Sequence, residues 1–187
     1  MNFPDLAYLA TKRLANLTES QRWYEEAFLY AIYSGNSMEA KKFVGKFKPT
    51  KKETYIPLYH FLIEQHRYQE ALNLLQEYAI KYPEEREKVK KELMITYFLL
   101  GRIKEGEEIL NELIEGKGKE EKKKLILTSI KKIIEVGAYE EAKRIIWNYL
   151  RFFEKDREVL KELLKLSLQT GDPHFAAEVA EEIIRRK

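Results

Sequence analysis

The sequence predicts an all-α protein in which one N-terminal helix precedes five stacked pairs of antiparallel helices. The turn residues that predict these pairs are 31, 35, 36 and 34 residues apart, a period typical of repeated helical pairs. Each is followed five positions later by Ala or Gly, which lets two helices approach closely. Charged residues make up 35% of the 187 residues and hydrophobic residues 44%, with 5 Pro and 8 Gly, a composition that favours amphipathic helices. The turn and small residues are Gly35/Ala40, His66/Ala71, Gly101/Gly106, Gly137/Ala142 and Gly171/Ala176.

The expected elements follow each other in a regular order. Leucines at helical spacing predict a first helix over residues 4–17, and Thr18 with Gln21 predicts a capping box at the start of the next helix. Helix A of each pair is expected at 21–34, 52–65, 86–100, 121–136 and 156–170, and helix B from 37, 68, 103, 139 and 174. Pro49 and Pro83 are expected to follow helix B of the first two pairs. We therefore expect an N-terminal helix and cap over 1–20 and one continuous domain over 21–187.

Two of the turns carry a known motif. Residues 137–142 read Gly-Ala-Tyr-Glu-Glu-Ala and residues 66–71 read His-Arg-Tyr-Gln-Glu-Ala. They resemble the tetratricopeptide repeat (TPR), in which a turn glycine, an aromatic residue two positions on and an alanine three later organise a helix-turn-helix. Ser37, Ile103 and Pro173 replace the aromatic residue in the other repeats, so the chain resembles a divergent member over 21–187. The resemblance implies a right-handed α-solenoid.

The resemblance also implies a groove on the helix A face that holds a segment of another protein. In repeats three to five, lysines alternate with apolar residues on this face. We expect the lysines to attract an acidic or C-terminal peptide and the apolar side chains to supply contact area. In the alternative interpretation the lysines only solvate exposed helices and Phe98 contacts the next repeat. The predicted partner-binding residues are Lys88, Lys91, Ile95, Phe98, Lys124, Leu127, Lys131, Lys161 and Lys165.

Two other binding functions remain open. The chain could associate with itself, through an apolar surface of the first repeats or through the last helix, which no further repeat covers. The basic cluster that includes Lys117, Lys119, Lys122, Lys123 and Lys124 would suit single-stranded RNA, as in the similar pentatricopeptide repeats. The net charge of only +3 argues against RNA. The residues of the first self-association surface are Leu29, Ile32, Tyr33, Ile56, His60 and Ile63, and those of the last helix are Phe175, Val179, Ile183 and Ile184.

No residue pattern predicts catalysis, a cofactor or a metal. The sequence has no cysteine, and His60, His66 and His174 are too far apart to bind one metal ion together. Adjacent carboxylates such as Glu25 and Glu26 diverge by about 100° around a helix, so they are expected on solvated faces. We therefore expect a non-enzymatic protein.

Location and source are predicted from composition alone. The first residues carry Pro4, Asp5, Lys12 and Arg13, which excludes the apolar core of a signal peptide from this stretch, and no run of about 20 apolar residues occurs. A cytoplasmic protein without membrane contact is expected. Its Lys- and Glu-rich, cysteine-free composition resembles that of thermophile proteins.

Overall fold

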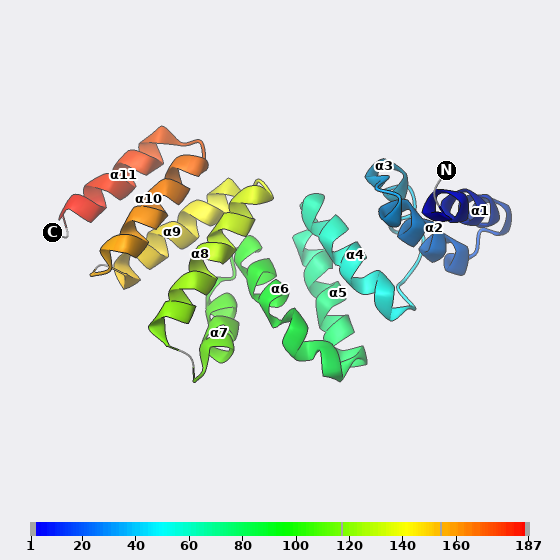
Figure 1. Cartoon of the computed structure of the whole chain (residues 1–187), viewed down its shortest axis with the longest axis horizontal. Coiled ribbons are helices and arrows are strands. Elements are labelled where there is room, and N and C mark those ends of the chain that lie inside the picture. The colour runs from blue at the N-terminus through cyan, green and yellow to red at the C-terminus, as the bar shows by residue number, and fades with distance from the viewer. Residues whose placement is uncertain (1–2, 117, 154, 186–187) are drawn as a thin grey trace. The chain divides into compact units, whose positions relative to one another are not determined.

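The computed structural model describes residues 3–116, 118–153 and 155–185. In these ranges the chain forms helices connected by short turns, without a strand (Figure 1). This confirms the predicted all-α fold of paired helices. The chain divides into two compact units, Met1–Leu62 and Ile63–Lys187.

The first unit is built around two neighbouring helices and a short third one. Helix α1 packs along α2, and α2 contacts α3. The core of this unit is aromatic, with the rings of Phe28 from the second helix and Phe61 from the fourth 6.0 Å apart in an edge-to-face arrangement. Helices of this unit are α1 (Phe3–Thr18), α2 (Gln21–Tyr33), α3 (Ser37–Ala40) and α4 (Lys52–Glu64), of which the last two residues fall in the second unit.

Helix B of the first repeat is much shorter than predicted. It begins at Ser37 as expected but ends at Ala40, and turns replace it up to Lys46. Gly45 has a φ of 88°, a left-handed conformation that a continuing α-helix cannot contain. The expectation that this helix runs on towards Pro49 is therefore wrong, although Phe43 and Phe47 are buried all the same.

A buried carboxylate connects α2 to the start of α4. Glu25 is 1% exposed and accepts hydrogen bonds from the backbone N–H groups of Thr50 and Lys51 at 2.9 and 3.0 Å and from the Thr54 hydroxyl at 2.7 Å. Burial alone would raise the pKa of Glu25, but these donors and the Thr50 hydroxyl outweigh it and lower the pKa. The prediction of a solvated Glu25 is wrong.

The predicted capping box between α1 and α2 does not form. Thr18 is the last residue of α1, and its hydroxyl donates to the carbonyl oxygen of Leu14 at 2.8 Å. The N-cap of α2 is Ser20, whose side chain makes no capping hydrogen bond. The N-cap residue of α2 therefore lies two residues later than the capping-box motif predicts.

The second unit contains the remaining helical pairs. Helix α6 packs against α7, α8 against α9, and α10 against α11, and α10 also contacts α8 and α9. Each helix begins within two residues of its predicted position. These elements are α5 (Tyr68–Lys81), the 3-10 helix η1 (Pro83–Glu85), α6 (Arg86–Leu99), α7 (Ile103–Ile114), α8 (Lys119–Glu135), α9 (Tyr139–Phe152), α10 (Arg157–Gln169) and α11 (Pro173–Arg185).

The repeated turns share one backbone conformation. The four turn glycines have φ between 68° and 78°, and His66 has a φ of 56°. Glycine adopts this left-handed conformation freely, whereas other residues do so at a cost. The small residues five positions later, Ala40, Ala71, Gly106, Ala142 and Ala176, are all buried. The turn register that defines the repeats is therefore confirmed.

Candidate functional site

All nine predicted partner-binding residues lie on three helices of the second unit. Lys88, Lys91, Ile95 and Phe98 are on α6, Lys124, Leu127 and Lys131 on α8, and Lys161 and Lys165 on α10. In Figure 1 these helices belong to three successive pairs. Their side chains fall into three groups. Some are buried in the core, some are exposed but already form ion pairs, and some are open to contact with a partner.

Two of the predicted apolar contacts lie inside the protein. Ile95 and Phe98 are each 1% exposed. The Phe98 ring lies directly over Gly106, where an added Cβ would come within 2.4 Å of the ring. Phe98 thus packs between α6 and α7, and neither Phe98 nor Ile95 is available at the surface.

Four of the six predicted lysines already have a carboxylate nearby in sequence. Lys88 pairs with Glu85 at 3.0 Å, and Lys131 lies 4.0 Å from Glu135. On α10, Lys161 and Lys165 pair with the glutamates three residues before them, each at 2.8 Å. Such exposed pairs contribute little to stability, but they neutralise the local charge.

Lys91 and Lys124 differ from the other four lysines. Neither forms an ion pair with any residue that the structure describes. Both line one hollow of about 260 Å³, which we call the α6–α8 hollow. Its other lining residues are Leu113 and Ile114 from the end of α7 and Glu121, Leu125 and Thr128 from α8.

The α6–α8 hollow combines apolar walls with two lysines that form no ion pair with a described residue. Leu113, Ile114 and Leu125 are half-buried, so each keeps part of its apolar surface open to a ligand. Glu121 is an exposed carboxylate in the same lining and reduces the net positive charge to +1. Charged groups around an apolar surface steer a ligand of opposite charge, while the apolar surface supplies contact area.

A second hollow of about 440 Å³ lies between the first turns of α8 and the end of α9. Lys123 pairs with Asp156 there, and the Lys122 Nζ lies 4.3 Å from the centre of the Phe152 ring. The structure thus divides the basic cluster of the sequence, because Lys122 and Lys123 line this hollow and Lys124 lines the other. Lys117 of that cluster lies outside the described residues. The lining is Lys119, Lys122, Lys123, Phe152, Phe153, Lys155 and Asp156.

The described residues offer neither a metal-binding cluster nor a membrane-spanning helix. In residues 3–116, 118–153 and 155–185 no three His, Cys, Asp or Glu side chains are grouped so that they could hold a metal ion. No helix in those ranges has the length and apolar character needed to cross a bilayer. His66 contacts its own turn, with its Nδ1 atom 2.6 Å from the Tyr68 hydroxyl oxygen.

The comparison with protein families gives a match to the tetratricopeptide repeat over residues 62–125. This stretch contains α5, η1, α6, α7 and the first turns of α8, and so most of the α6–α8 hollow. The match covers 64 of the 187 residues, and this stretch is similar to the tetratricopeptide-repeat family. Left-handed turn glycines of the same kind occur outside the matched stretch, at Gly35 and Gly171.

Other comparisons add two distant structural likenesses. A structure titled MamA MSR-1 C2 has 15% identity and a TM-score of 0.45 over 89% of this chain and 95% of its own. A putative kinesin light chain from Podosopora anserina with nearly identical TPR-like repeats has 16% identity and a TM-score of 0.39 over 100% of this chain and 96% of its own. A search of curated proteins finds no match.

Proposed function

We propose that the chain is a non-enzymatic adaptor that binds an acidic segment of another protein in the α6–α8 hollow. Stacked helical repeats are a fold typical of protein-interaction scaffolds. The observation that supports this site is the pair Lys91 and Lys124, which lack ion-pair partners among the described residues and lie beside the apolar end of α7.

The expected ligand follows from the lining of the hollow. An acidic side chain beside an apolar one would place a carboxylate near Lys91 and Lys124 and an aliphatic or aromatic group against Leu113 and Ile114. Glu121 would repel a carboxylate placed beside it, which favours one orientation of the segment. Exposed Lys88, Lys131, Lys161 and Lys165 would add little to binding, because a neighbouring glutamate already neutralises the charge of each.

A selection from random displayed peptides tests this function without a known partner. The full chain is immobilised, enriched peptides are sequenced, and the affinity of the best peptide is measured by fluorescence polarisation. We expect acidic peptides with an apolar residue. The double variant Lys91→Glu/Lys124→Glu should weaken binding by about tenfold or more. Each lysine alone contributes modestly, but its reversal to glutamate replaces attraction of the acidic peptide by repulsion.

The control is Lys161→Glu/Lys165→Glu, which makes the same change in net charge at lysines that are already paired. It should leave the affinity within about twofold of wild type. Equal weakening by both double variants would mean that only the overall charge matters, and an unchanged affinity of the Lys91/Lys124 variant would reject the site. A single-stranded RNA pool serves as a competitor, and displacement of the peptide by RNA at low salt would favour the RNA-binding function instead.

A further inference from the structure

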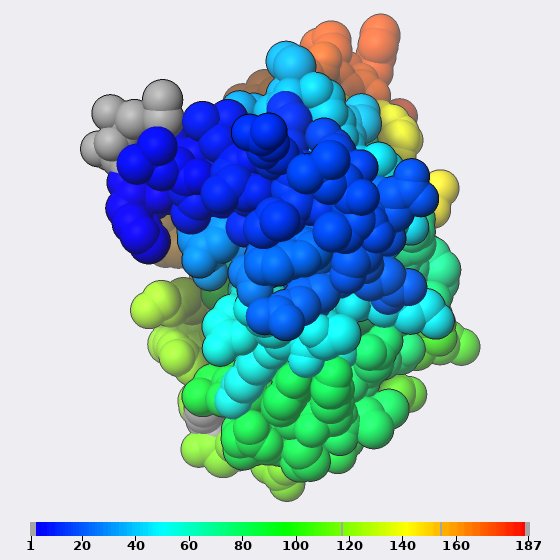
Figure 2. All heavy atoms as spheres, turned by 90° about the vertical axis from the view of Figure 1, so that its right-hand side faces the viewer, coloured from blue at the N-terminus to red at the C-terminus, as the bar shows by residue number. Residues whose placement is uncertain are grey.

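Helix α1 has a second apolar face that no described part of the chain covers. Its buried face consists of Tyr8, Thr11 and Ala15 and packs inside the first unit. On another side Phe3, Leu6, Leu14 and Leu17 are 78%, 55%, 36% and 73% exposed, with exposed Ala10 between them. At 100° per residue these five positions span only about 80° of the helix circumference. We call them the α1 stripe; Figure 2 shows α1 in dark blue at the surface of its unit.

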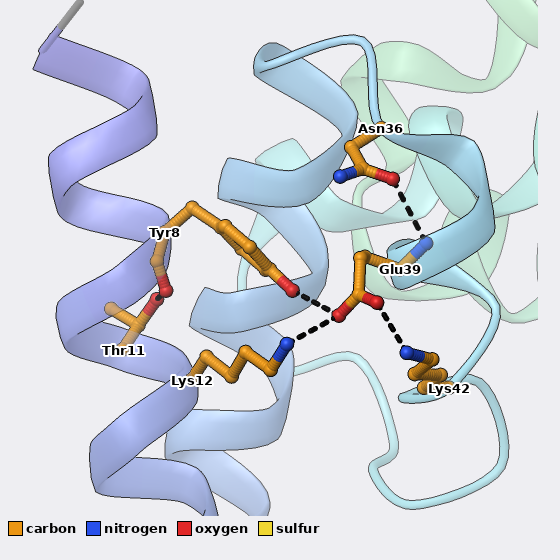
Figure 3. A network of polar contacts seen from close by, with 6 residues as sticks. All are labelled: Tyr8, Thr11, Lys12, Asn36, Glu39 and Lys42. Atoms are coloured by element: carbon orange, nitrogen blue, oxygen red, sulfur yellow. Dashed lines mark hydrogen bonds and ion pairs between the residues drawn. The ribbon is translucent and has the colours of Figure 1, made fainter. Parts of the chain in front are cut away.

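A polar network fixes the rotation of α1 and keeps the α1 stripe outside. The Tyr8 hydroxyl and the Lys12 ammonium both donate to one carboxylate oxygen of Glu39, the latter at 2.6 Å, and Lys42 donates to the other oxygen (Figure 3). Glu39 is itself held in place because its backbone N–H donates to Asn36 at 3.1 Å. Turning the α1 stripe inward would break both contacts that α1 makes with Glu39.

The spacing of the α1 stripe is the same in both directions. From Phe3 to Leu17 the intervals are three, four, four and three residues. A two-fold axis through Ala10 would therefore place Phe3 of one copy against Leu17 of the other and Leu6 against Leu14. A two-fold interface requires this kind of self-complementarity, and a small residue at the crossing point lets the two helices approach closely.

The charges and the area of this face suit a second copy. No charged residue belongs to the α1 stripe; Arg13 lies at its edge, and Lys12 is engaged with Glu39. Taking about 200 Å² for a fully exposed large side chain, the four large side chains expose roughly 500 Å² per copy. A symmetric pair would bury roughly 1,000 Å², the size at which specific interfaces begin.

We propose that two copies of the chain form an antiparallel dimer through the α1 stripe, with the two-fold axis at Ala10. This surface belongs to the first unit, whereas the proposed peptide site belongs to the second. The dimer therefore does not depend on the proposed partner, and either proposal can fail alone.

Sedimentation velocity of the full chain from about 1 to 100 µM measures the association. We expect a monomer–dimer equilibrium. Leu6→Glu/Leu14→Glu changes two exposed residues, so the helix should still fold, and it should give a monomer throughout this range. The control Met38→Glu changes a residue of the same unit that is 79% exposed but lies outside the α1 stripe, and it should leave the dimer intact.

Crosslinking tests the position of the axis. The sequence has no cysteine, so Ala10→Cys provides a single thiol next to its symmetry mate, and a short bismaleimide should join two copies. Asn16→Cys, exposed on another side of α1, should crosslink much less. A chain that stays monomeric at the highest concentration, a dimer that persists in Leu6→Glu/Leu14→Glu, or equal crosslinking at both positions would overturn the proposal.

Discussion

Gly106 and Phe98 form the contact that distinguishes the third repeat from the other four. At the small position of helix B the other repeats carry alanine, and three residues before the turn they carry Ile or Leu. In the third repeat the Phe98 ring occupies the space in which an alanine Cβ would lie, 2.4 Å away. Phe98 is 1% exposed, so its ring has no free space to enter. The larger residue on α6 thus requires the smaller one on α7.

Gly106→Ala should therefore destabilise the protein by about 1–3 kcal/mol, the usual cost of overfilling a packed core. Adding Phe98→Ile, which restores the residue pair of other repeats, should recover part of this loss. Chemical denaturation of both single variants and the double variant measures the coupling. Gly118→Ala is the control, because its Cβ would meet nothing within 4 Å. Additive effects of the two changes would contradict the proposed contact.

Residue patterns predict the turns well and the buried carboxylate not at all. The left-handed turn at His66 follows from its place in the column of turn glycines, although histidine gives no such signal alone. Glu25 has the sequence context of a solvated residue, since Glu26 is adjacent and the helix is amphipathic. Its donors come from a segment 25 to 29 residues later, and helical periodicity carries no information on a contact of that range.

At the scale of elements, α1 is held by its packing along α2 and by one carboxylate, Glu39, from another part of the first unit. Hydrogen bonds from Lys12, Lys42 and Tyr8 lower the pKa of Glu39 from 4.5 to about 2. A depressed pKa in the folded state stabilises that state above the unfolded value, and the contribution disappears as the pH falls through the folded value. The contact should therefore be complete above about pH 5 and be lost towards pH 2.

Glu39→Gln tests this pH dependence. The variant should be less stable than wild type near neutral pH, and the difference in free energy of unfolding should shrink between about pH 5 and pH 2. Urea denaturation of both proteins at a series of pH values gives this difference directly. Glu70→Gln, at an exposed pair with Arg67, is the control and should show a much smaller change. A difference that stays constant down to pH 2 would show that Glu39 does not hold α1.

The sequence predicts the positions of the helices correctly where the repeat is regular. The prediction fails where one repeat departs from the pattern. Helices A are periodic over three or four turns, and their predicted starts agree with the structure within two residues. Helix B of the first repeat has the same small residue, Ala40, but Gly45 leaves the helical conformation at φ 88°. A glycine inside an apolar pattern is compatible with a helix that continues and with one that ends. Phe43 and Phe47 are buried in the segment that follows the helix.

At the scale of the whole molecule, the two proposed surfaces are on separate compact units. The resemblance to TPR proteins indicated the helices on which we propose the peptide site, but not which of their lysines lack an ion-pair partner. Lys91 and Lys124 both have glutamates three or four residues before them, as the paired residues Lys88, Lys161 and Lys165 do. Glu87 and Glu120 pair instead with Lys90 and Lys123, a choice that side-chain packing makes. The binding face stays a prediction from the sequence, and the hollow beside Lys91 and Lys124 is known only from the structure.

Backbone hydrogen exchange of the full chain, with and without the selected acidic peptide, tests the central claim most directly. The account predicts slower exchange in the segments that line the α6–α8 hollow, around Lys91, Ile114 and Lys124, and no change in α1 or α2. The free chain and the peptide-bound chain are measured at the same protein concentration, so that any effect of self-association on exchange is the same in both. Protection confined to the first unit, or to the hollow beside Phe152, would contradict the account.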